Sequence, residues 1–451
     1  MPATDLHGLP LTVASADAAD AFNDVVLGYL SYRADVPQRL AGLLAADGDC
    51  PMAHVLRGAF TLLSFRQASV PAAREALLQA QSLSAAATER ERMHIAALAH
   101  WTAGDLDATL GTWEQILDAH PLDVLAFRMH HFIAFWHGQP DRMGATAETA
   151  YRTWGGELPG YGSLLACRCF ANEELGNYAI AEEAGRAAIA RDPADLWAAH
   201  GVAHVMEMQG RREDGIAWLH SLEPHWDGGN NLKHHLWWHR GLYHFERREF
   251  DTVLALYDRN FRNLASPLTQ QQPDLYIDVQ NAASMLFRLE RQGVDVGSRW
   301  SEIADKAEAR IGDCLSVFTL PHWMMALVAA GRFESAGRMV EAMRAFAARG
   351  EGSAAPLVRE CALPISEALI ARGRGDPARA CELMRPALAR MQRLGGSHAQ
   401  QDVLEQLFLD CAVAARRTDD VRLLLDRVRR EFPDAAPETR LGYAEAARAL
   451  Q

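Results

Sequence analysis

The sequence has few β-branched residues, no cysteine pair of metal-binding spacing and no long apolar run. Seven cysteines are scattered from Cys50 to Cys411, and only Cys167 and Cys169 stand close together. Residues i and i+2 point apart on a helix, so we expect buried free thiols in a reducing compartment. No stretch reaches 18 apolar residues, and residues 1–20 contain no Lys or Arg. These absences predict no membrane span, no secretory signal and a cytoplasmic protein.

Positive charge is also in short supply. The chain has 58 acidic and 45 basic residues and a net charge of −13. An acidic surface repels phosphate backbones, so we expect no nucleic-acid partner. The sequence contains no nucleophile elbow, kinase signature, P-loop or Rossmann fingerprint, which excludes the enzyme classes that those motifs mark. What it does contain is alanine and leucine, and this composition favours helix.

A repeat is visible in the glycines. Four phrases each end an amphipathic segment, turn on a glycine and begin another segment, and the turns fall at Gly104, Gly138, Gly176 and Gly210. The spacings of 34, 38 and 34 residues are typical of the tetratricopeptide repeat, a helix–turn–helix unit. The sequence therefore predicts an all-α, tetratricopeptide-like α-solenoid, that is, a superhelix of antiparallel helix pairs with imperfect repeats in the C-terminal part.

We expect three regions along the chain. N-terminal helices occupy residues 1–50, the repeat array residues 51–264, and a degenerate helical or capping region residues 265–451, continuous with the array. The best single unit runs over residues 162–193. In that unit, Cys169 is the small residue at the position where the two helices must approach closely.

Histidines cluster on positions that the repeat register predicts to face the concave groove. His200, His204 and Glu207 follow at spacings of four and three, so they share one helix face. His235 and His239 form a second i,i+4 pair on the next repeat. Neighbouring helices lie about 8–10 Å apart, so the two pairs could nearly meet.

Three interpretations of the cluster stay open. The histidines could be packing residues beside Trp237 and Trp238. They could line a site for a carboxylate or another polar small molecule. They could also hold a divalent transition metal such as zinc or iron, or act as acid and base, with the metal activating water. The candidate metal ligands are His200, His204, His235 and His239. No HExxH motif is present to decide the matter.

A second polar group follows in the C-terminal part. Asp274 and Asp278 are predicted to stand one turn apart on a helix, with Asn281 on the same side. Ser397 is a predicted N-cap. The remaining polar candidates of this part are His322, Gln400 and Asp402.

The chain resembles the tetratricopeptide repeat protein 38 family over most of its length. The resemblance rests on "HHFIAFWHG", "DLWAAHGVAHVMEMQGR", "HHLWWHRGLYHFERREFDTVLALYD", "SMLFRLERQGVDVGSRW" and "LGGSHAQQDVLEQL". It implies a tetratricopeptide-like fold and no named reaction. The chain departs from the family pattern at Phe132, Pro321 and Asn281, where the family carries acidic residues. The polar positions that the resemblance marks are His131, His200, His204, Glu207, His235, His239, Asp278, His322, Gln400 and Asp402.

These ten residues define our leading hypothesis, a concave pocket that binds a small polar molecule or a peptide end. Asp278, His322 and Asp402 would join the pocket if the C-terminal helices curl back over the groove. One alternative is a metal-dependent or acid/base enzyme, a hydrolase or lyase, that uses the same residues. A second alternative is a protein–protein interaction scaffold. The sequence leaves open the ligand, any catalysis, the metal and whether the chain forms a homo-oligomer.

Overall fold

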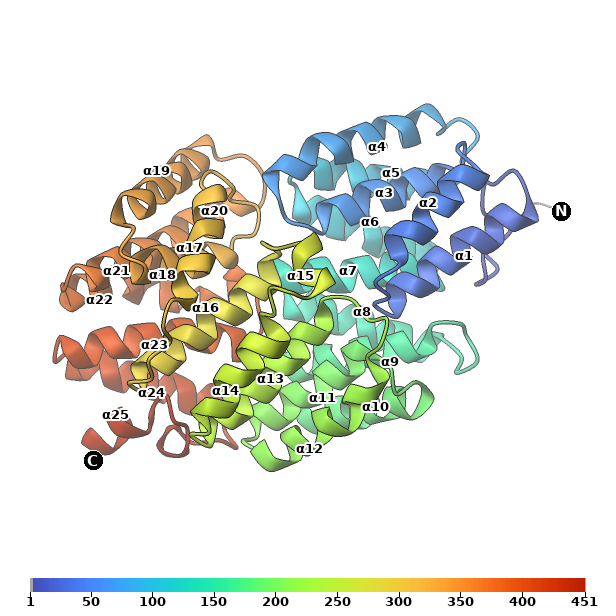
Figure 1. Cartoon of the computed structure of the whole chain (residues 1–451). Coiled ribbons are helices and arrows are strands. Elements are labelled where there is room, and N and C mark those ends of the chain that lie inside the picture. Colours follow the sequence, from blue (N-terminus) through green and yellow to red (C-terminus); the bar gives the residue numbers. More distant parts are fainter. Residues whose placement is uncertain (1–2, 451) are drawn as a thin grey trace. The chain divides into compact units, whose positions relative to one another are not determined.

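Helices form nearly all of the regular structure in the computed structural model, which describes residues 3–450 (Figure 1). Within these residues there is no β-strand, and only the isolated bridges Thr4–Pro10 and Arg33–Gly229 occur. None of the described helices combines the length and the hydrophobicity that crossing a bilayer requires. The predicted all-α class is confirmed.

The helices follow one another with short connections. The first twelve are α1 (Ala16–Leu30), α2 (Val36–Ala46), α3 (Pro51–Leu62), α4 (Val70–Ser82), α5 (Glu89–Thr102), α6 (Leu106–Ala119), α7 (Val124–Trp136), α8 (Pro140–Thr153), α9 (Tyr161–Glu174), α10 (Tyr178–Arg191), α11 (Leu196–Met208) and α12 (Arg212–Leu222). The others are α13 (Leu232–Glu246), α14 (Phe250–Leu256), α15 (Pro267–Gln271), α16 (Tyr276–Arg291), α17 (Arg299–Ala309), α18 (Thr319–Ala329), α19 (Phe333–Arg349), α20 (Ala354–Leu357), α21 (Leu363–Gly373), α22 (Pro377–Leu388), α23 (His398–Ala414), α24 (Thr418–Glu431) and α25 (Ala444–Ala449). Short 3₁₀ turns lie at Gln67–Ser69, Glu223–His225, Met391–Leu394 and Pro437–Thr439, and π turns at Tyr257–Phe261 and Val358–Ala362.

The turning glycines lie where the repeat predicted them. Gly104, Gly138, Gly176 and Gly210 each follow the first helix of a pair and have φ between 64° and 82°. Glycine adopts this left-handed conformation without the steric cost of a Cβ atom. The same turn recurs between α18 and α19 and between α21 and α22. The helix-pair architecture of the solenoid, with weaker regularity in the C-terminal part, is therefore confirmed.

The close approach predicted at Cys169 is also present. A Cβ atom added to Gly185 on α10 would lie 2.7 Å from Cys169 Sγ on α9, and one added to Gly201 would lie 2.6 Å from it. Distances this short leave no room for any larger residue at either glycine. All seven cysteines are buried and free, as predicted.

The described chain divides into two compact units. One comprises the part up to Val202 together with Pro224–Leu232, and the other comprises Ala203–Glu223 together with the part from Lys233 onward. In the first unit α3, α4, α5 and α6 pack side by side. In the second unit α16 packs against α17, α18 and α23. The predicted division into residues 1–50, 51–264 and 265–451 stays a prediction.

Two local expectations have different outcomes. Ser397 caps α23 as predicted, in a capping box with Gln400. Asp274, however, is not on a helix with Asp278, because α16 begins only at Tyr276. Asp274 instead pairs with Arg310 at 3.0 Å. Leu275 has a non-helical backbone with φ −59° and ψ 129°, so the helix starts later than the polar pattern suggested.

Candidate functional site

Helix α11 carries the first histidine pair. Asp195 caps this helix, because its Oδ1 accepts hydrogen bonds from the backbone N–H groups of Trp197 at 3.0 Å and Ala198 at 2.9 Å. The cap satisfies two N–H groups that would otherwise lack a helical partner. It also fixes where the helix begins. His200 and His204 therefore stand one turn apart on the same face.

Helix α13 carries the second pair, and one side chain fastens it to α11. Tyr243 OH donates a 2.6 Å hydrogen bond to the carbonyl oxygen of Ala203. A Cβ atom at Gly215 on α12 would lie 2.3 Å from the Tyr243 ring, so only glycine leaves room for this ring. The fastening point is one residue from His204. The hydrogen bond fixes the position of α13 along α11. It thereby places His239, one turn before Tyr243, beside His204.

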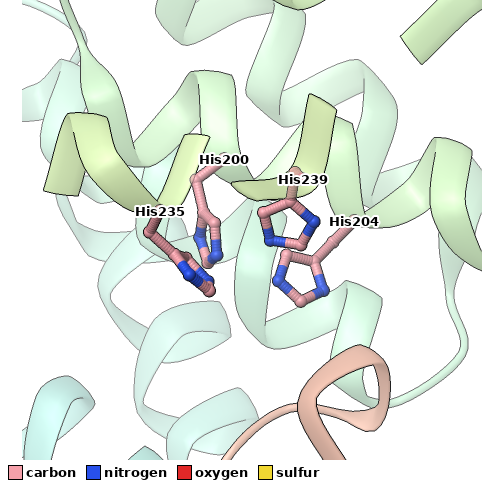
Figure 2. A group of neighbouring side chains, drawn as sticks. All are labelled: His200, His204, His235 and His239. Atoms are coloured by element: carbon pink, nitrogen blue, oxygen red, sulfur yellow. The ribbon is translucent and has the colours of Figure 1, made fainter. Parts of the chain in front are cut away.

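The four imidazoles of these two helices gather around one point (Figure 2). One nitrogen from each of His200, His204, His235 and His239 lies within 4.8 Å of the other three. All four side chains are at most 2% exposed. His200 and His204 belong to the same helix, α11.

Three of the histidines are in direct ring contact. The His204 and His239 rings have their centroids 4.4 Å apart, and the His235 and His239 rings 4.7 Å apart, both edge to face. His235 stacks on Trp238 at 4.9 Å with the planes only 12° apart. This packing limits how far each ring can turn, so the nitrogens are positioned before any ligand arrives.

A hydrogen bond orients His235. Its Nδ1 lies 2.7 Å from Asn281 Oδ1 on α16. An amide oxygen only accepts, so Nδ1 carries the hydrogen and Nε2 carries the lone pair. A metal-binding histidine usually has its second nitrogen fixed in this way by an oxygen acceptor. Asn281 thus orients His235 without adding a charge.

The surroundings keep the rings neutral. Burial lowers the pKa of His204 and of His239 well below the usual value, and the neighbouring imidazoles lower it further. Burial also lowers the pKa of His235, to about 4, although Asn281 opposes this. A neutral imidazole is the form that binds a metal. At neutral pH these three side chains are therefore ready nitrogen donors.

His200 is held by aromatic rings. It stacks on Phe170 at 5.1 Å and on Trp197 at 4.6 Å, with interplanar angles of 29° in both cases, and these two rings contact each other at 4.6 Å. His131 lies in the same unit but does not belong to the four-histidine group. Its Nε2 accepts a 3.3 Å hydrogen bond from Trp197 Nε1. His131 therefore supports the indole that holds His200.

Glu207 follows His204 by one turn on α11 and is half-buried. Burial raises the pKa of Glu207 to about 7, against the opposing effect of Arg440. Glu246 and Asp402 raise it further. A carboxyl group with this pKa can give or take a proton near neutral pH.

Asp278 pairs with a histidine that the sequence analysis missed. His234 Nδ1 lies 3.1 Å from Asp278 Oδ2, and both side chains are buried. His234 is next to His235 in the chain and so points to a different side of α13. The partners are 44 residues apart in sequence. Only a signal that links the two helices could have found this pair.

The remaining predicted residues belong to the interior of the second unit. His322 Nδ1 donates to the Phe318 carbonyl at 2.9 Å, and burial lowers the pKa of His322 to about 4. Gln400 donates to Gln280 Oε1 at 3.2 Å. The structure does not include either residue, or Asp402, in the four-histidine group.

Asp402 is the centre of a separate buried ion-pair network. Its oxygens accept hydrogen bonds from Arg288 and Arg440, each at 3.0 Å, and from Tyr443 OH at 2.5 Å. Burial alone would raise the pKa of Asp402, but the two arginines reverse this and lower it. Asp402 is therefore ionised and fully compensated. The sequence indicated Asp402 but not Arg288, Arg440 or Tyr443 as its partners.

The comparisons with known proteins give only weak similarities. No family model matches the chain. The chain is similar to the structure of Naa15/Naa10 bound to HypK-THB, with 14% identity, 92% of this chain and 68% of that chain covered, and a TM-score of 0.26. It is also similar to yeast Tom70, with 10% identity, 89% and 96% covered, and a TM-score of 0.27. A third similar structure is the TPR domain of P58(IPK), with 10% identity, 89% and 99% covered, and a TM-score of 0.18.

Proposed function

We propose that this helical-repeat protein binds a divalent transition metal ion through its histidine cluster. His204, His235 and His239, all in the second unit, supply three ligands, and His200 is the candidate for a fourth. The observation that carries the proposal is the convergence of four buried imidazole nitrogens within 4.8 Å of one another. Four neutral imidazoles that face one point can all bind one cation.

The donor set limits the choice of metal. Imidazole nitrogen suits zinc, copper, nickel and iron, whereas magnesium and calcium prefer oxygen. Zn–N bonds of about 2.0–2.1 Å in a tetrahedron place the nitrogens roughly 3.4 Å apart. In the structure the four nitrogens lie within 4.8 Å of one another, so small rotations of the rings would bring them to that spacing. We therefore expect zinc or a neighbouring first-row ion.

An all-imidazole site also predicts what the loaded protein binds. Neutral nitrogen ligands do not balance the 2+ charge of the ion, and the buried carboxyl groups of Glu173 and Glu174, which lie within 4.8 Å of a His204 nitrogen, are not members of the four-histidine group. A buried charge of this kind attracts an anion as a further ligand. If three histidines hold the ion, one position stays open for a carboxylate, as in a small acid or a peptide end.

The first test is metal content. Protein without a polyhistidine tag is stripped with a chelator, dialysed against zinc or cobalt, and analysed for bound metal. We expect one equivalent in the wild type and none in the double variant His204→Ala/His239→Ala. His130→Ala is the matched control, because His130 is equally buried but pairs with Glu114 at 2.9 Å in the first unit. Equal metal content in the wild type and the double variant would sink the proposal.

The variant His200→Ala distinguishes a site with four histidine ligands from a site with three histidine ligands and one open position. If His200 is a fourth ligand, His200→Ala weakens metal binding strongly. If the three histidines of the second unit suffice, His200→Ala keeps most of the affinity and the fourth position belongs to solvent or an external ligand. A scaffold role without any metal instead predicts that all of these variants behave like the wild type.

The second candidate function is a metal-dependent hydrolase or lyase, favoured by the position and pKa of Glu207. A carboxyl group with a pKa of about 7, one turn from a metal ligand, suits a general base for metal-bound water. Glu207→Gln should keep the metal and lose turnover when the loaded protein is screened against esters and peptides. If the loaded wild type turns over none of these substrates, the catalytic candidate is dropped and metal binding stands.

A further inference from the structure

A second candidate site lies in the second unit, between α23, α24 and α25. There the structure has a cleft of about 420 Å³. This volume is in the range of sites for small organic ligands. Five arginines line the cleft: Arg248, Arg291, Arg416, Arg417 and Arg448. The acidic lining residues are Asp410 and Glu445. A basic cleft stands out on a chain whose net charge is −13.

Two of these arginines have an unfavourable backbone conformation. Arg248 ends the turn between α13 and α14 with φ of 61°, and Arg416 ends the turn between α23 and α24 with φ of 55°. The equivalent turns of the N-terminal repeats carry glycine, as at Gly104 and Gly176. A non-glycine residue in this region is strained, and such strain concentrates at functional sites. Both strained arginines line the same cleft.

The charges of the cleft are only partly compensated. Arg291 donates to Gln406 Oε1 at 2.7 Å and lies 3.6 Å from Asp410, and Arg417 is paired with Asp420. Arg248, Arg416 and Arg448 are exposed and have no acidic partner within 4 Å in the part of the chain that the structure describes. Three guanidinium groups around one cleft therefore remain available for an oxyanion.

The cleft also has apolar lining residues. Leu409, Val413 and Leu441 also line it, and Val413 is 51% exposed. An exposed apolar side chain beside guanidinium groups suits a ligand with an apolar body and a charged end. An inorganic ion would leave this apolar surface in water.

We propose that the cleft binds a small organic anion, with a phosphate or carboxylate group held by Arg248, Arg416 and Arg448 and an apolar body against Val413 and Leu441. Arginine forms paired hydrogen bonds to both kinds of oxyanion. The site shares no residue with the histidine cluster, so it does not depend on the proposed metal.

The test uses the full chain and three probes in isothermal titration: phenyl phosphate, inorganic phosphate and benzyl alcohol. We expect the wild type to bind phenyl phosphate more tightly than inorganic phosphate and to show no binding of benzyl alcohol. Benzoate in place of phenyl phosphate distinguishes a carboxylate from a phosphate preference, and tighter binding of either supports the shared oxyanion chemistry.

The decisive variant is Arg248→Gly/Arg416→Gly. Because glycine adopts positive φ without strain, the melting temperature should stay the same or rise, while phenyl phosphate affinity falls about tenfold or more. The charge-matched control is Arg379→Gln/Arg422→Gln, which removes two exposed arginines outside the cleft. Undetectable phenyl phosphate and benzoate binding by the wild type would overturn the proposal. So would unchanged affinity in the glycine variant, or an equal loss in the control.

Discussion

Two groups of residues with buried histidine, one around His94 in the first unit and one around His204 and His239 in the second, differ in how the buried rings are compensated. In the first unit His94 Nε2 lies 2.9 Å from Asp123 Oδ2, and Arg90 bonds the same oxygen at 3.0 Å. In the cluster of α11 and α13, His204 and His239 instead contact each other and His235. The first group is compensated within the protein by opposite charge. The second consists of like groups.

The difference teaches where to look for function. A buried histidine beside a carboxylate completes an ion pair, so it needs nothing from outside and supports the fold. Buried histidines beside one another tolerate burial only while neutral, and together they offer lone pairs to a cation. Burial alone therefore does not mark a site. The chemistry of the partners does.

The largest expected effect is the loss of metal from the cluster. Zinc at about a thousand times its dissociation constant should stabilise the wild type by roughly 4 kcal/mol, because it binds only the folded state. His204→Ala/His239→Ala should lose this stabilisation entirely, as measured by thermal unfolding with and without zinc. His94→Ala should keep it. Zinc stabilisation of the double variant would contradict the distinction between the two groups.

A substitution in the first unit, Asp123→Asn, disrupts the group formed by Arg90, His94 and Asp123. Asp123→Asn leaves Arg90 and His94 without their shared carboxylate and should lower the free energy of unfolding by about 3–5 kcal/mol. Denaturant titration measures this loss. Zinc affinity of the folded protein should be unchanged, since the substitution lies in the other unit. A small stability loss would show that the ion pair is not needed for the fold.

Acid should separate the groups by pH. Burial lowers the pKa of His235 and of His322 to about 4, so the unfolded chain binds more protons than the folded one between about pH 6.5 and 4. Stability of the metal-free protein should therefore fall across this window, on the order of 2 kcal/mol for each histidine. Chemical denaturation at half-unit pH steps in chelator checks this, and a flat profile would be inconsistent with neutral buried rings.

The first group should respond only at lower pH. Burial alone would raise the pKa of Asp123, but His94 and Arg90 reverse this and hold it far below the usual range. A carboxyl group with a depressed pKa loses its stabilising contribution as the pH falls below the unfolded value of about 3.9. Asp123→Asn should therefore remove the part of the acid-induced stability loss that begins below about pH 3.9.

The smallest expected effect concerns orientation. Asn281→Ala removes the acceptor that fixes His235, and it should weaken zinc binding about 10–100-fold without removing a ligand. Ser284→Ala is the matched control on the same helix, because Ser284 accepts from Trp238 rather than from a ligand. Competition with a chromophoric chelator measures both affinities. Equal affinities would mean that the hydrogen bond does not position the ring.

How much of the fold and of the site can be predicted depends on how far apart the interacting residues lie in the sequence. The glycine spacing and the i,i+4 histidine pairs are local signals, and both correctly anticipate helices and shared faces. The partnerships of His234 with Asp278 and of Asp402 with Arg288 span 44 and 114 residues, so no helical period reveals them. The left-handed Arg248 is a departure from the repeat pattern. The sequence shows that this turn has no glycine, but it does not show that Arg248 lines a cleft.

X-ray absorption at the zinc edge of the tag-free, zinc-loaded protein tests the central claim most directly. The account predicts nitrogen neighbours at about 2.0–2.1 Å with the outer-shell scattering of three or four imidazole rings. It also predicts that this signal is lost in His204→Ala/His239→Ala. A shell of oxygen neighbours without imidazole scattering, or the same spectrum from the double variant, would contradict it.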